Sequence, residues 1–112
     1  MSNQAADQID HILPKIVAQI LSVGNPERII LFGSQARGDI HVGSDVDLLV
    51  IEPSGQPRYK RAVRYRRALT GLGPAKDIVV WTPDEVAEWQ KVPNAFITMA
   101  LNEGIVLYER DQ

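Results

Sequence analysis

The chain has 112 residues, of which 45% are hydrophobic and 23% are charged, a composition typical of one globular domain. Its formal net charge of −2 provides no overall basic field for nucleic acid, and the absence of cysteine excludes disulfides and thiolate zinc sites. The N-terminus carries no signal-peptide pattern, and no apolar run reaches membrane-spanning length. We therefore expect a single domain over residues 1–112, without membrane contact, in the reducing environment of the cytoplasm.

The first expected element is an amphipathic helix over residues 9–21. Pro14 lies inside its pattern and predicts either a kink or a late start, whereas Gly24 and Pro26 predict the end of the helix. We interpret this helix as a structural cover for a sheet. Its apolar residues recur at intervals of three and four and define the buried face: Ile9, Ile12, Leu13, Ile16, Val17, Ile20 and Leu21.

Two apolar runs, Arg28–Phe32 and Asp45–Ile51, predict strands on either side of the most informative stretch of the chain. The second run begins with two aspartates separated by one residue. Because residues i and i+2 of a strand point to the same face, the carboxylates of Asp45 and Asp47 should project side by side. Such a pair suits Mg²⁺, which usually shares its shell with substrate phosphates, and two such ions can clamp the attacking and leaving oxygens of a displacement.

A turn after the first strand is expected to cradle phosphate. Gly33 permits close backbone approach and a positive φ, and Ser34 would cap a short turn that ends at Arg37. Arg37 could neutralise a phosphate or brace the loop through Asp39, and the residues alone leave both readings open. The competing interpretation of the whole stretch is a turn followed by a solvated acidic strand end. Such an end needs no second carboxylate on the same face.

A basic helix is expected over Arg58–Leu69, with Pro57 near its first turn. One side of this helix is strongly basic. It could be solvated, or it could meet nucleotide phosphates, an RNA backbone or an acidic surface of a partner. Our hypothesis is the acidic surface, which would contribute mainly to the rate of association. The helix carries six of the twelve basic residues of the chain, and four of them fall on one side: Lys60, Arg61, Arg64 and Arg67.

The run Lys76–Trp81 predicts a third strand, and Asp77 is an isolated acid at its start. We interpret Asp77 as a third carboxylate that binds the catalytic metal and helps to deprotonate an acceptor hydroxyl. Downstream, Thr82 and Asn94 are the expected N-caps of two helices, and Asp84 and Glu85 are structural acids at the first helix's positive end. These helices and a last strand are expected over residues 82–91, 95–103 and 105–108.

These motifs together resemble a known family. Gly-Ser, ten residues and Asp-x-Asp are similar to the signature of the DNA-polymerase-β-like nucleotidyltransferases. The fuller pattern, LFGSQARGD followed by GSDVDLLV, resembles the minimal nucleotidyltransferase (MNT) subgroup. The resemblance implies an α/β (α+β) fold with a mixed sheet of about four strands and helices mainly on one face. The family pattern also places a carboxylate on the next strand, which corresponds to Asp77.

The resemblance further implies a catalytic and metal-binding set, a nucleotide-binding set and a partner. It implies two Mg²⁺ ions and transfer of AMP from ATP to an acceptor hydroxyl. MNT proteins are commonly antitoxins of HEPN-domain toxins, so the expected acceptor is a tyrosine hydroxyl on such a toxin, which AMPylation would inactivate. The expected metal ligands and catalytic residues are Asp45, Asp47 and Asp77, and the expected nucleotide-binding residues are Gly33, Ser34 and Arg37.

Two other functions are compatible with the sequence. One is an antitoxin that neutralises its partner by contact alone, without catalysis. The other, less favoured, is nucleotidyl transfer to a small molecule or RNA, because 112 residues leave little protein to hold such an acceptor. A nucleic-acid partner is not expected. A second molecule that docks beside the aspartate pair is instead expected to supply the acceptor.

Overall fold

The computed structural model describes residues 4–33, 36 and 45–110. Its four strands form one sheet in the order β3-β2-β1-β4, in which β2 and β3 are parallel and β1 is antiparallel to both β2 and β4. The expected mixed four-stranded sheet is therefore confirmed. The elements in chain order are α1 (Gln4–Val23), β1 (Arg28–Phe32), β2 (Val46–Ile51), α2 (Arg58–Arg61), α3 (Val63–Ala68), β3 (Lys76–Trp81), α4 (Pro83–Trp89), α5 (Phe96–Glu103) and β4 (Ile105–Glu109).

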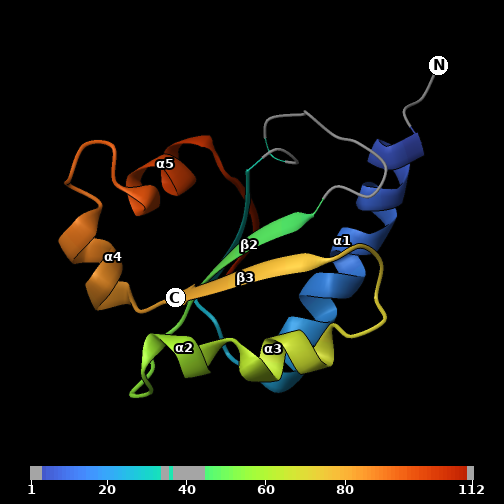
Figure 1. The fold of residues 1–112 in the computed structure, drawn as a ribbon, viewed down its shortest axis with the longest axis horizontal. Coiled ribbons are helices and arrows are strands. Elements are labelled where there is room, and N and C mark those ends of the chain that lie inside the picture. The colour runs from blue at the N-terminus through green and yellow to red at the C-terminus, as the bar shows by residue number, and fades with distance from the viewer. Residues whose placement is uncertain (1–3, 34–35, 37–44, 111–112) are drawn as a thin grey trace.

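Helices lie on both faces of this sheet, with the larger layer on one of them. Figure 1 shows α1, α2 and α3 grouped on one side and the two short helices α4 and α5 on the other. Alternate residues of β2 enter the two cores, as the pleat of a strand requires. Leu48 packs with Ile16 of α1 and Tyr65 of α3, whereas Leu49 packs with Ile97 of α5. Strand β2 is therefore covered on both faces, which explains its uninterrupted apolar run.

Three helix boundaries differ from the sequence prediction. Helix α1 begins at Gln4, so Pro14 lies in its interior and does not mark a late start. The single helix predicted over Arg58–Leu69 is divided at Ala62 into α2 and α3. Asn94 is not an N-cap: its φ of 65° excludes the extended conformation that a cap requires, and Ala95 takes that position instead. Among the described helices, none is long and apolar enough to cross a membrane.

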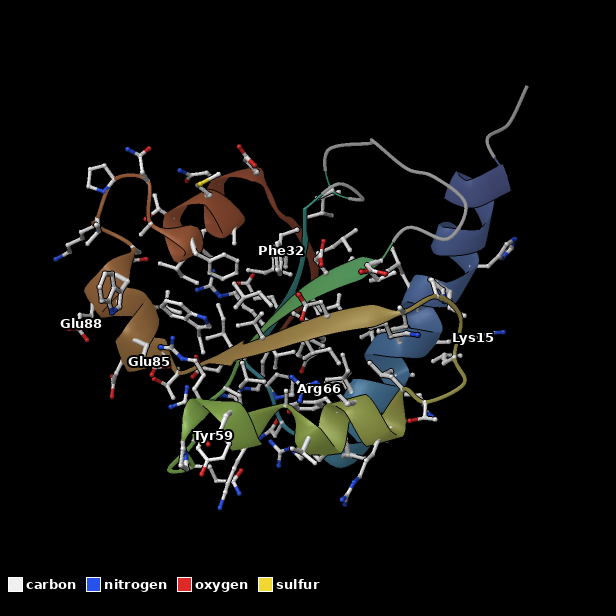
Figure 2. All side chains as sticks on the ribbon, viewed as in Figure 1. Lys15, Phe32, Tyr59, Arg66, Glu85 and Glu88 are labelled. Atoms are coloured by element: carbon white, nitrogen blue, oxygen red, sulfur yellow. The ribbon has the colours of Figure 1, made fainter. Side chains whose placement is uncertain are left out.

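Helix α4 begins with the predicted cap. The hydroxyl of Thr82 accepts a hydrogen bond from the Glu85 amide, and the Glu85 carboxylate accepts one from the Thr82 amide, which completes a capping box. Glu85 also pairs with Arg61 at 2.7 Å and with Arg58 at 3.2 Å, and Figure 2 shows it facing α2. The hydrogen bond from Arg61, with those from Thr82 and Arg58, lowers the pKa of Glu85 to about 2 despite its partial burial. The structural role expected for Glu85 is confirmed.

This lowered pKa predicts a pH-dependent contribution of Glu85 to stability. A depressed carboxyl pKa stabilises the fold above the ordinary pKa of glutamate, near 4.3, and the contribution is lost as pH falls toward 2. Glu85→Gln can keep the capping box but loses the charge. We expect it to lower the free energy of unfolding by about 1–2 kcal/mol at pH 7 and to have little effect near pH 2. Urea unfolding at both pH values measures this, and an equal loss at both would contradict it.

Candidate active site

Two of the predicted carboxylates lie at corresponding positions of neighbouring strands. In the parallel pair of β2 and β3, Asp47 is the register partner of Asp77. Both residues share the strand parity of side chains that pack toward α4 and α5, such as Leu49 and Trp81, so both carboxylates belong to that face of the sheet. Asp45 is exposed and lies immediately before β2, two residues ahead of Asp47. The topology thus brings Asp47 and Asp77 to the same end of the sheet.

Gly33 lies directly against one of these carboxylates. It follows β1, whose last residue, Phe32, is the register partner of Asp47. Gly33 has a φ of 77°, and a Cβ atom placed on it would lie 2.3 Å from Oδ2 of Asp47. Only glycine therefore fits here without displacing the carboxylate, because any side chain would meet both backbone strain and a steric clash. The positive φ expected for Gly33 is present, whereas its predicted close approach to phosphate stays a prediction.

A small, mainly apolar pocket opens beside this turn. It has a volume of about 230 Å³ and is lined by residues of β1, the turn and α5: Phe32, Gly33, Phe96, Met99, Ala100 and Glu103. The rings of Phe32 and Phe96 meet edge to face at 5.2 Å, and Phe96 stays 41% exposed. Such a pocket can bury a flat or apolar part of a ligand whose charged part lies near Gly33. No sequence pattern indicated that Met99 and Glu103 would line this pocket.

The structure does not test the roles predicted for the remaining site residues. Ser34 and Arg37 lie outside the described residues, so their expected roles in nucleotide binding stay predictions. Over residues 4–33, 36 and 45–110, no three His, Asp or Glu side chains form a group that could hold a metal ion. The shared role of Asp45, Asp47 and Asp77 in metal binding therefore also stays a prediction, supported by the register of the last two and by the preference of Mg²⁺ for carboxylate oxygens.

The basic helix is not part of this site. Its residues belong to the α1 side of the sheet, because Ala62, Tyr65 and Leu69 pack with α1, whereas Asp47 and Asp77 belong to the α4–α5 side. Two of its four aligned cations already have acidic partners within the chain. Arg61 pairs with Glu85, and Arg64 pairs with the buried carboxylate of Glu52. The hypothesis that this basic side meets an acidic surface of a partner therefore concerns a different side of the sheet from Asp47 and Asp77, and it stays a prediction.

Comparison with known proteins agrees with this architecture. The family model described as nucleotidyltransferase domain matches residues 12–107. No curated protein gives a significant match to the chain. Among solved structures, a protein from Sulfolobus solfataricus assigned to the nucleotidyltransferases superposes with a TM-score of 0.68 at 22% identity, over 98% of this chain and 91% of that one.

Two further solved structures come from toxin–antitoxin systems. A toxin–antitoxin complex with AMP-PNP has a TM-score of 0.64 at 19% identity, and it covers 89% of this chain and 75% of that one. A toxin–antitoxin MntA–HpeT pair carrying two aspartate-to-glutamate substitutions has a TM-score of 0.60 at 16% identity, with the same coverage of both chains. At these identities the likeness establishes a common fold.

Proposed function

Because the chain belongs to the nucleotidyltransferase domain family, we propose that it is a Mg²⁺-dependent nucleotidyltransferase that transfers AMP from ATP to a hydroxyl group. The single observation that carries this proposal is the placement of Gly33 against Asp47, with Asp47 in register with Asp77. A backbone turn that can approach phosphate and two carboxylates that can hold a cation thereby meet at one end of the sheet. This is the minimum that phosphoryl-type transfer requires of a protein.

The proposed chemistry follows from these groups. Asp47 and Asp77, with Asp45 as the third carboxylate, would hold the divalent cation through oxygen ligands. When bound, that cation supplies charge neutralisation for the triphosphate. The Gly33-Ser34 turn would orient the phosphates through its amides, and Arg37 would offset their charge. Attack of the acceptor oxygen on the α-phosphorus forms one P–O bond and breaks the bond to the bridging oxygen, so that pyrophosphate leaves. Asp77 would accept the proton of the hydroxyl.

We further propose that the chain acts as an antitoxin and that its acceptor is a tyrosine hydroxyl on a HEPN-type toxin. The support is the likeness of its fold to two toxin–antitoxin structures, one of which contains AMP-PNP. The other carries glutamate in place of two aspartates that are two positions apart, the same spacing as Asp45 and Asp47.

Label transfer tests this proposal directly. The purified chain is incubated with Mg²⁺ and ATP labelled at the α-phosphate, with and without the product of the neighbouring gene, and the products are examined by mass spectrometry. We expect label from the α-phosphate, but not from the γ-phosphate, on a tyrosine of the partner, and no transfer in the presence of EDTA. Neutralisation of the partner without any label transfer would instead identify an antitoxin that works by contact.

A further inference from the structure

Charge is unevenly distributed along this chain. Residues 53–76 carry seven of the twelve Lys and Arg residues and none of the fourteen Asp and Glu residues, so the remainder of the chain is strongly acidic although the total is only −2. Helices α2 and α3 hold six of these seven cations. A positive surface confined to one element of an acidic protein produces a local field that can attract an oppositely charged partner.

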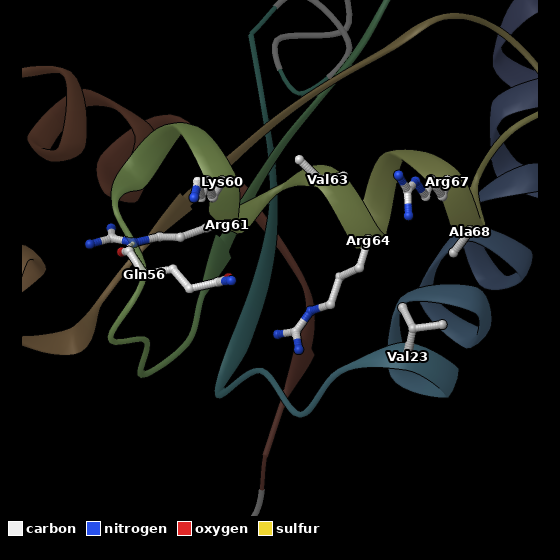
Figure 3. Close-up of a pocket in the computed structure, with 8 residues that line it drawn as sticks. All are labelled: Val23, Gln56, Lys60, Arg61, Val63, Arg64, Arg67 and Ala68. Carbon is white, nitrogen blue, oxygen red and sulfur yellow. Dashed lines mark hydrogen bonds between the residues drawn. The ribbon is translucent and has the colours of Figure 1, made fainter.

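A groove of about 630 Å³ follows these two helices. Figure 3 shows its basic side chains along α2 and α3, with Val23 from the end of α1 at one edge. Among the residues that the structure describes, no acidic side chain lines it. Two of its apolar side chains, Val23 and Val63, remain 41% and 39% exposed. We call this surface the basic groove, and the residues used below are Val23, Lys60, Arg61, Val63, Arg64 and Arg67.

The four cations of the basic groove differ in how far their charge is already offset. The guanidinium of Arg61 is largely buried and pairs with Glu85, and that of Arg64 donates to Glu52 and Tyr65. Within the described part of the chain, no carboxylate pairs with Lys60 or Arg67, and both are exposed. Arg61 and Arg64 therefore shape the groove, whereas Lys60 and Arg67 offer the charge that a ligand can meet.

We propose that the basic groove binds an acidic segment of a partner protein, as a docking site separate from the carboxylates of the active site. The groove belongs to the α1 side of the sheet and Asp47 to the opposite side, so occupation of one does not block the other. The cations of the groove favour a partner segment that is acidic. The exposed valines fit apolar residues interspersed among the carboxylates of that segment. This inference does not depend on the proposed catalytic activity.

A polypeptide fits the basic groove better than RNA. Proteins that bind single-stranded nucleic acid combine a basic track with aromatic side chains on which bases stack. No aromatic ring of the described residues lines the groove, and the remainder of the chain is acidic enough to repel a long phosphate backbone. A free phosphate would gain nothing from Val23 or Val63. An amphipathic acidic segment can pair its carboxylates with the cations of the groove and pack its apolar residues against the exposed aliphatic side chains.

Fluorescence anisotropy with defined probes tests the docking site. The main probe is a labelled amphipathic peptide of about 14 residues with Glu at its polar positions, and the comparison probes are the same peptide with Gln, and a uridine oligonucleotide. The variant Lys60→Glu/Arg67→Glu reverses the two available charges. The matched control Lys15→Glu/Arg66→Glu makes the same change in net charge outside the groove lining, on α1, where Figure 2 shows Lys15 projecting outward, and elsewhere on α3.

We expect the Glu peptide to bind the unmodified chain, more weakly as salt rises, and to bind the Lys60→Glu/Arg67→Glu variant at least about tenfold more weakly. The control variant should stay within about twofold of the parent. Equal losses in both variants would overturn the proposal, because net charge alone would then explain binding. Equal affinity for the Gln peptide, or binding of the oligonucleotide alone, would also overturn it. Peptide binding is measured without ATP or Mg²⁺, so its outcome does not depend on the chemistry of the active site.

Discussion

An Asp47→Asn variant should lose nucleotidyl transfer by at least about 100-fold, while its melting temperature stays within about 3 °C of the parent. The amide keeps the shape of the side chain but removes the negative charge that would hold a cation. Asp47 is only partly buried, and its fully buried neighbours Val46 and Leu48 pack on the opposite side of the sheet. Its loss should therefore affect chemistry far more than folding. Asp77→Asn should behave in the same way.

The matched control for these variants is Asp84→Asn. Asp84 is an exposed acid in the first turn of α4 and is not among the carboxylates at the end of the sheet. The Asp84→Asn variant should retain transfer activity and lose only the small interaction of an acid with the positive end of a helix. If Asp47→Asn and Asp77→Asn both melted far below the parent, the two aspartates would be structural acids. Full activity in either variant would remove that residue from the proposed metal site.

Much of the fold and part of the site could be predicted from the sequence because they depend on local patterns. The apolar runs placed the strands to within about one residue, and Thr82 and Pro83 marked the start of α4. The alternation of a strand predicted that Asp47 would share a face with other residues of its parity. What the sequence could not supply was that β2 and β3 are parallel neighbours in register, which is the reason that Asp47 and Asp77 correspond.

The basic helix illustrates what a local pattern misses. A helical wheel put Lys60, Arg61, Arg64 and Arg67 on one side, and all four do line one groove. The acids that pair with Arg61 and Arg64 are 24 and 12 residues away in the sequence, so neither pairing was visible before the fold was known. The pocket beside Gly33 was also not visible in the sequence, for the same reason. It depends on the packing of α5, with Phe96 and Met99, against β1, which is a long-range contact.

A Gly33→Ala variant should have the second large effect, because the added methyl group would compete with the carboxylate of Asp47 for the same space. The Cβ atom would lie 2.3 Å from Oδ2, far inside contact distance, and the φ of 77° disfavours any side chain. The carboxylate must therefore shift, and a displacement of about 1 Å at a catalytic group can lower the rate by about 100-fold. We expect a loss of that size in label transfer, together with a fall in stability of about 1–2 kcal/mol from the backbone.

Gly71→Ala separates the two causes. Gly71 has a φ of 79°, almost the same as Gly33, but a Cβ atom on it would meet nothing within 4 Å. This control should lose about as much stability as Gly33→Ala, as measured by urea unfolding, and should keep its transfer activity. If both variants lost activity equally, the effect at Gly33 would come from general destabilisation. If Gly33→Ala alone lost activity, the contact between the turn and Asp47 would be required for catalysis, because backbone strain is common to both variants.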